Sequence, residues 1–139
     1  MDTEATRHLV DDLYGAYARG DGERVAQLID DDIDWIIHGP VQVFPFLGPR
    51  RGKAEVLKTL ADIGEGYAIE RYEPDIVIVD KDRAAVMSNV AMRQRSTGRT
   101  LSFRLVNFLR FRDGKIIEFR EFSDTFDVVE QAIGRWLEV

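Results

Sequence analysis

The stretch "TGRTLSFRLVNFLRFRDGKIIEFREFSDT", residues 97–125, alternates apolar and polar side chains on both sides of one tight turn. Alternation with a period of two is typical of β-strands that bury one face. "RDGK" at 112–115 supplies the Asp-Gly pair that short hairpin turns favour. The sequence therefore predicts an antiparallel hairpin with strands over residues 99–112 and 115–123.

Two segments upstream show the same alternation. They cover residues 68–79 and 83–95, and the polar turns "DKDR" at 80–83 and "STGR" at 96–99 separate them from each other and from the hairpin. Alternating segments that follow one another across short polar turns are typical of consecutive hairpins. We therefore expect four antiparallel strands in the second half of the chain.

Four other segments repeat apolar residues every three or four positions, which is typical of amphipathic helices. They are residues 3–19, a short segment that Asp21 can cap and that extends through Ile29, residues 52–66, and the closing segment 124–139. Three helices therefore precede the four strands, and one helix follows them.

The region between the second and third helices is less regular. "WIIHG" at 35–39 is a short apolar stretch and predicts a strand that ends at Gly39-Pro40. Residues 40–52 hold three of the four prolines of the chain, which disfavours ladder pairing and predicts an irregular loop. This aromatic loop either covers a cavity or forms a small core cluster of its own.

Helices first and consecutive hairpins afterwards are the pattern of an α+β domain. A long antiparallel sheet twists and curls, so helices packed on its concave side enclose a cone that leaves a pocket if they do not fill it. We expect three N-terminal helices on a curved, mostly antiparallel sheet, followed by a C-terminal helix. On the other face Phe108 alternates with Arg104 and Arg110, which favours a partly polar dimer surface.

The composition indicates one ordinary domain over residues 1–139. Hydrophobic residues make up 45% and charged residues 32% of the chain, and its apolar runs are far shorter than a membrane span. The N-terminus is acidic and polar, unlike a signal peptide, and there is no cysteine. We expect a cytoplasmic protein with no disulfide, thiolate metal site or membrane partner.

The net charge of −6 argues against a domain that neutralises phosphates, so we expect no nucleic-acid partner. A local basic patch does occur on or near one hairpin, and no stacking motif accompanies it. We interpret it as a solvated face formed by Arg93, Arg95, Arg99 and Arg104.

The order of the elements resembles the SnoaL-like family of the nuclear transport factor two-like superfamily. "YARGDGERVAQLIDDDIDW" at 17–35, "GKAEVLKTL" at 52–60 and the hairpin over 97–125 carry the resemblance. The superfamily also contains ketosteroid isomerases, limonene epoxide hydrolases and polyketide cyclases. The resemblance implies a conical α+β barrel, an apolar cavity for a small hydrophobic ligand, and a homodimer through the outer sheet face.

Two polar residues of the predicted hairpin are candidates for catalysis. Asn107 shares a strand face with apolar residues, and by the resemblance it lies where ketosteroid isomerases keep a neutral acid that donates to the enolate oxygen. Glu121 lies where limonene epoxide hydrolases carry a cavity carboxylate, and apolar walls would raise its pKa. The alternatives are a structural amide at Asn107 and a register that points Glu118 inward instead.

Asp124 and His38 are two further candidates. Asp124 ends a strand and precedes a helix, so it is either an N-cap or, as often in SnoaL-like proteins, an acid at the cavity mouth. His38 follows the first strand in an apolar setting and is either a proton carrier or a histidine satisfied at the strand end. Together with Glu121 and Asn107 they form the candidate catalytic set.

The cavity wall should consist of aromatic and aliphatic side chains, although residues at such spacing also serve as plain core. The candidates are Tyr14, Tyr17, Trp35, Phe44, Phe46, Leu60, Phe103, Leu105 and Phe119. No motif for a metal, phosphate or cofactor is present, so we expect no cofactor.

The chain departs from both enzyme patterns. The general-base aspartate of ketosteroid isomerases would fall at about Ile37 and their helix-one tyrosine at about Leu13, while no second acid matches the epoxide hydrolase site. Three hypotheses remain: a cofactor-independent enzyme of isomerase, cyclase or hydrolase type that transfers protons on a small hydrophobic carbonyl compound, a binding domain without turnover, and a protein-interaction domain.

Overall fold

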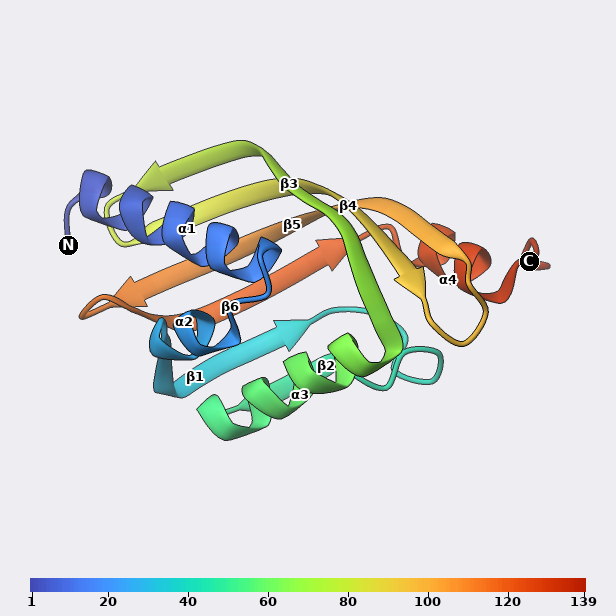
Figure 1. Ribbon diagram of the computed structural model, residues 1–139. Coiled ribbons are helices and arrows are strands. Elements are labelled where there is room, and N and C mark those ends of the chain that lie inside the picture. The colour runs from blue at the N-terminus through green and yellow to red at the C-terminus, as the bar shows by residue number, and fades with distance from the viewer.

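The protein is built on a curved six-stranded sheet with helices packed against its hollow side (Figure 1). The computed structural model describes residues 1–139. The strands are β1 (Ile29–Ile37), β2 (Gly48–Arg51), β3 (Tyr67–Asp80), β4 (Arg83–Gln94), β5 (Thr100–Arg112) and β6 (Lys115–Ser123), in the spatial order β2-β1-β6-β5-β4-β3. Only β1 and β6 pair in parallel, so the predicted α+β cone with a mostly antiparallel sheet is confirmed.

Four helices complete the fold. They are α1 (Thr3–Ala18), α2 (Gly22–Gln27), α3 (Lys53–Gly66) and α4 (Thr125–Ile133). Aspartates cap three of them by accepting a backbone N–H at the first turn: Asp2 from Ala5 at 2.7 Å, Asp21 from Arg24 at 3.1 Å, and Asp124 from Asp127 at 3.2 Å. These bonds satisfy donors that a helix start leaves without a partner.

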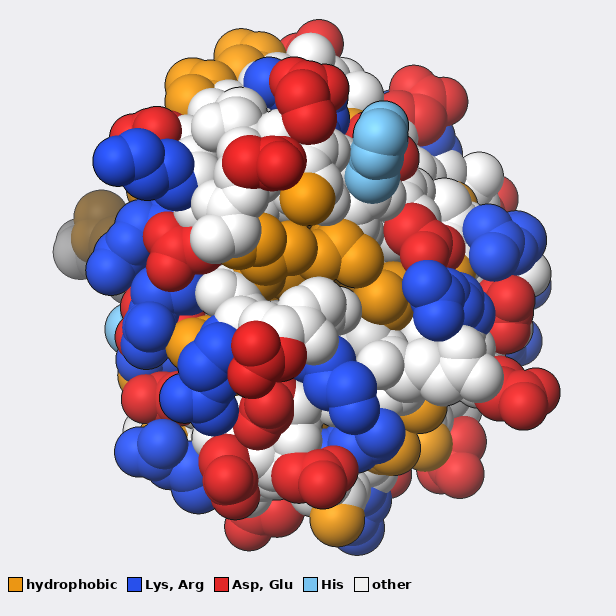
Figure 2. Space-filling view, turned by 90° about the vertical axis from the view of Figure 1, so that its left-hand side faces the viewer, with side chains coloured by type: hydrophobic (Ala, Val, Ile, Leu, Met, Phe, Trp, Pro, Cys, Tyr) orange, Lys and Arg blue, Asp and Glu red, His pale blue; other side chains and the backbone are white.

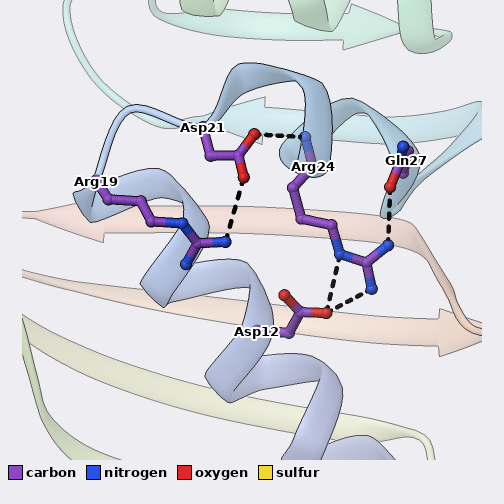
Figure 3. Close-up of polar contacts among 5 residues, drawn as sticks. All are labelled: Asp12, Arg19, Asp21, Arg24 and Gln27. Carbon is purple, nitrogen blue, oxygen red and sulfur yellow. Dashed lines mark hydrogen bonds and ion pairs between the residues drawn. The ribbon is translucent and has the colours of Figure 1, made fainter.

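A polar network fixes α2 against α1, as Figure 3 shows. Arg24 donates through Nε to Asp12 at 3.0 Å and through a terminal nitrogen to Gln27 at 2.9 Å, while Arg19 pairs with Asp21 at 3.2 Å. The hydrogen bond from Arg24 lowers the pKa of the Asp12 carboxyl. The network therefore holds the α1–α2 corner in place and with it one wall of the cone.

The second helix is shorter than the sequence pattern indicates. It ends at Gln27, and Ile29 begins β1, so the prediction of a helix through Ile29 is wrong. Ile29 and Ile33 are 1% and 0% exposed, and the acids between them point outward or lie half-buried. A tertiary contact explains why Ile29 belongs to a strand, because it pairs with Ile116 on the parallel neighbour β6.

The proline-rich segment is also more regular than predicted. Residues 48–51 of this segment form β2, which pairs with β1 and places Arg50 opposite Trp35. β2 is an edge strand, where Pro49 is tolerated because its missing N–H faces no partner. The prediction of an irregular loop therefore holds only up to Leu47.

The closing helix stops earlier than predicted. Gly134 takes the left-handed conformation at φ 73° and ends α4 after Ile133. The apolar side of this helix was expected to continue to the end of the chain, but Trp136, beyond the turn, is 82% exposed. The guanidinium of Arg99 packs where a side chain at position 134 would lie, which also favours glycine there.

The surface carries charges of both signs. Figure 2 views the end of the molecule where the N-terminus lies, and basic and acidic side chains are interspersed there around a small hydrophobic patch. This face therefore has no extended field of one sign. None of the helices has the length and apolar character needed to cross a bilayer.

Candidate functional site

A largely apolar cavity lies inside the cone. Its volume is about 130 Å³, and 22 of its 27 lining residues are hydrophobic. A cavity of roughly 150 Å³ accommodates a benzene-sized molecule. The cone therefore has room for a compact ligand of about one ring.

The predicted wall residues all line this cavity, from Tyr14 and Tyr17 on α1 to Phe119 on β6. Sequence reasoning missed Tyr67, Tyr72 and Met92, which line it from β3 and β4. The alternation along β3 gave no usable signal for Tyr72, because the strand has two register shifts. Tyr67, Tyr72 and Met92 are partly exposed in the cavity region.

A chain of hydrogen bonds crosses the polar end of the cavity. The Tyr14 hydroxyl donates to Asn107 Oδ1 at 2.6 Å, and Asn107 Nδ2 donates to Glu121 Oε1 at 3.0 Å. Asn107 and Glu121 meet because the β5–β6 register places them directly opposite each other. Asn107 is fully buried, so both ends of its amide are paired inside the protein.

Glu121 is a carboxyl group in an apolar setting. Burial raises its pKa to about 7, and the hydrogen bond from Asn107 opposes this by stabilising the charged form. Its side chain remains partly exposed and lines the cavity. Near neutral pH the group therefore exists in both protonation states, as acid–base catalysis requires.

The surrounding phenols stay protonated. Burial, and then the nearby Glu121 charge, raises the pKa of Tyr14 and Tyr72 well above the usual value and that of Tyr17 to about 12. Glu121 is consequently the only one of these four groups that titrates near neutrality. The cluster pairs one proton acceptor with several hydroxyl donors.

His38 lies at the edge of the cavity. Its backbone N–H donates to the carbonyl of Glu121 at 3.0 Å, while its ring stacks on Phe122 at 4.4 Å between ring centres. Phe122 is 44% exposed and belongs to the outer face of β6. His38 thus lies at the rim of the cavity, which it lines together with Glu121.

Asp124 lies outside the cavity lining. Its exposed carboxylate accepts the Asp127 N–H as the N-cap of α4. Arg93, which the sequence analysis placed on a solvated basic face, is likewise exposed and outside the lining. The structure therefore brings together Tyr14, Asn107 and Glu121, and it separates Asp124 and Arg93 from them.

The family can now be assigned from a direct comparison. The model of the SnoaL-like domain matches residues 10–119, which is most of the chain. The chain belongs to the SnoaL-like family. A search of curated protein sequences finds no match.

Solved structures agree with the SnoaL-like assignment. A proposed isomerase from Rhodopseudomonas palustris has a TM-score of 0.84 at 38% identity, covering 97% of this chain and 100% of the other. An NTF2-like protein from Burkholderia xenovorans has a TM-score of 0.82 at 29% identity, covering 94% and 98%. An epoxide hydrolase of the limonene type from M. tuberculosis shares the fold, with a TM-score of 0.77 at 15% identity and coverage of 95% and 92%.

Leu13 and Ile37, at which the resemblance implied apolar residues instead of the ketosteroid isomerase tyrosine and aspartate, line the cavity wall and are 8% and 6% exposed. The carboxyl group that lines this SnoaL-like cavity comes from β6, as Glu121.

Proposed function

We propose that this SnoaL-like protein is a cofactor-independent enzyme of isomerase or cyclase type that moves a proton on a small hydrophobic carbonyl compound. The observation that supports it is the Tyr14–Asn107–Glu121 chain, which presents one carboxyl group with a pKa of about 7 to an apolar cavity. A carboxyl group with a pKa near neutrality in a mainly apolar cavity is an arrangement that general acid–base catalysis uses.

In the proposed step, Glu121 takes a proton from the carbon next to a carbonyl group and returns it at the same or another carbon. Asn107 donates to Oε1 at 3.0 Å, which leaves Oε2 without a protein hydrogen-bond partner and free to act on the substrate. We expected Asn107 to polarise the carbonyl, but its buried, doubly paired amide favours positioning Glu121 instead. Asp124 and His38 take no part in this step.

The cavity supports a substrate class as well as a reaction. About 130 Å³ lined mainly by hydrophobic side chains fits a monocyclic ketone better than a steroid. The relative at 38% identity is named as a proposed isomerase, which agrees with reversible proton transfer.

The test is deuterium exchange at the α-carbon of small cyclic ketones in heavy water, followed by NMR. Glu121→Gln keeps the hydrogen bond to Asn107 and removes the base, so the exchange rate should fall by roughly 10²–10⁴. Glu118→Gln is the matched control, since Glu118 lies on the same strand and pairs with Arg110 at 3.8 Å outside the cavity. Equal exchange by wild type and Glu121→Gln would refute the proposal.

A binding domain without turnover is the alternative. The same cavity would then hold a small hydrophobic ligand that native mass spectrometry recovers unaltered. Co-purified ligand together with absent exchange would favour this alternative over the enzyme.

We further propose that two copies pair through the outer sheet face. This face exposes apolar side chains on three strands, which a lone domain would leave in water. Their exposed fractions are 49% for Phe108, 44% for Phe122, 47% for Ile76 and 62% for Ile78.

A further inference from the structure

Three tyrosines meet at the polar end of the cavity, and two of them keep an unpaired hydroxyl. The Tyr72 ring packs edge-on against Tyr17 at 5.3 Å between centres and lies 6.1 Å from Tyr14. Tyr14 donates to Asn107, whereas the Tyr17 and Tyr72 hydroxyls have no protein partner. Neither is among the buried unpaired polar atoms, so both oxygens keep accessible surface.

Both tyrosines line the cavity and lie within electrostatic reach of Glu121. Their raised pKa values keep both hydroxyls protonated at neutral pH, so each remains a donor. A phenol is more acidic than an aliphatic hydroxyl, which makes it a stronger donor than Ser123 or Thr125 on the same wall.

Two other polar groups of the cavity are less available to a ligand. Asn107 is fully buried between Tyr14 and Glu121, and the unpaired Trp35 Nε1–H keeps no accessible surface. A carbonyl oxygen that develops negative charge next to Glu121 needs donors oriented toward it before the reaction. Tyr17 and Tyr72 are the free phenols of the cluster around Tyr14.

We propose that Tyr17 and Tyr72 together bind the substrate oxygen that becomes negatively charged, and that the substrate is an enolisable ketone or aldehyde of one ring. This rests on the proposed function, which it makes more specific by assigning the oxygen-binding pair.

The chemistry balances without a further reactant. The Glu121 carboxylate takes the proton of the α C–H bond, whose electron pair forms the enolate double bond while the carbonyl oxygen gains the negative charge. The two phenols donate to that oxygen. Glu121 then returns its proton to the α-carbon, or to the γ-carbon of an enone, and the carbonyl re-forms.

The experiment uses 4-nitrophenol, a planar one-ring probe whose absorbance distinguishes the phenol from the phenolate. About one pH unit below the pKa of Glu121 the carboxyl is mostly protonated, which mimics the enzyme after proton abstraction. Wild type should bind the probe as phenolate. Tyr17→Phe and Tyr72→Phe should each weaken binding roughly tenfold and shift the bound probe toward the neutral phenol.

Tyr67→Phe is the matched control, because the Tyr67 oxygen accepts from Gln94 Nε2 at 3.5 Å and its ring packs on Phe46 instead of in the Tyr14–Tyr17–Tyr72 cluster. It should change the affinity by less than about twofold, since both hydroxyls assigned to the substrate oxygen are retained. If a phenylalanine variant fails to fold, fluorotyrosine at the same position keeps the ring and makes the hydroxyl more acidic. Tighter phenolate binding is then the supporting result.

Wild-type affinity and an unshifted spectrum in folded Tyr17→Phe and Tyr72→Phe would overturn the assignment, as would a wild type that binds only the neutral phenol. The two proposals fail separately. If deuterium exchange into the ketone depends on Glu121 but on neither tyrosine, only the assignment of the oxygen-binding pair is refuted. If phenolate binding depends on the tyrosines but no ketone exchanges deuterium, the oxygen-binding pair is supported and the proposed enzymatic function is refuted.

Discussion

The apolar surroundings of Glu121 disfavour its charged form, which makes the stability of the fold depend on pH. Its pKa is about 7 in the folded protein and near 4.5 when unfolded, so the folded state binds the proton more tightly. Between these two values stability falls as pH rises, because charging costs more in the fold than in the unfolded chain. At about pH 8 the cost is roughly 2–3 kcal/mol once partial exposure is allowed for.

Glu121→Gln should therefore stabilise the protein while abolishing activity. We expect a gain of about 2–3 kcal/mol in the free energy of unfolding near pH 8 and little change near pH 5. Urea denaturation at both pH values measures this. A loss of stability at pH 8 would contradict the assigned environment of Glu121.

Asn107 should control the acidity of its partner. Its hydrogen bond lowers the pKa of Glu121, so Asn107→Leu should raise that pKa above 7 and move the pH profile of activity upward. NMR titration of the Glu121 carboxyl carbon measures the shift directly. The change also leaves the Tyr14 hydroxyl unpaired, which should cost about 1–3 kcal/mol of stability. An unchanged titration would exclude the positioning role.

The inward position of Asn107 was accessible from the sequence, because alternation along its strand separates arginines from apolar residues. That of Glu121 depended on the family resemblance, since alternation alone left open the register that points Glu118 inward. The Tyr14–Asn107 bond was not accessible from the sequence, since it joins residues 93 positions apart. Tyr72 was missed for another reason. Two register shifts in β3 break the alternation that would have revealed its face.

At the scale of one element, α4 tests the role of Asp124. Asp124→Ala removes the N-cap bond to Asp127 and should lower stability by about 1 kcal/mol, whereas Asp124→Ser should retain most of it. Both variants should keep wild-type exchange activity, because the side chain lies outside the cavity lining. Thermal unfolding measures the stability of both variants, and the deuterium-exchange assay measures their activity. Loss of activity in the serine variant would return Asp124 to the catalytic set.

Element boundaries were least predictable where tertiary contacts override local pattern. Ile29 continues a helical apolar stripe, yet pairing with Ile116 draws it into β1. β2 forms although Pro49 lies within it, because an edge strand tolerates a missing donor. The long hairpin strands, in contrast, follow from their local alternation of apolar and polar residues. The predicted β6 boundaries agree with the structure, since a turn and a cap limit that strand locally.

At the scale of the whole molecule, the curved sheet has an inner and an outer face with different surroundings. Its inner face supplies the cavity, and its outer face leaves Phe108 and Phe122 in contact at 6.2 Å between ring centres without cover. Charged neighbours on the same face, including the Arg104–Asp75 pair at 2.7 Å, would give such an interface a polar rim.

The proposed dimer predicts that Phe108→Arg dissociates the protein. The change puts a third cation beside Arg104 and Arg110 on both copies, so a symmetric interface meets like charge across the contact. Sedimentation equilibrium at micromolar concentration should show a dimer for wild type and a monomer for the variant. Trp136→Ser is the control, because Trp136 is 82% exposed and lies beyond α4 in the C-terminal segment. A monomeric wild type would refute the dimer and leave the cavity proposals intact, since every residue they use comes from one chain.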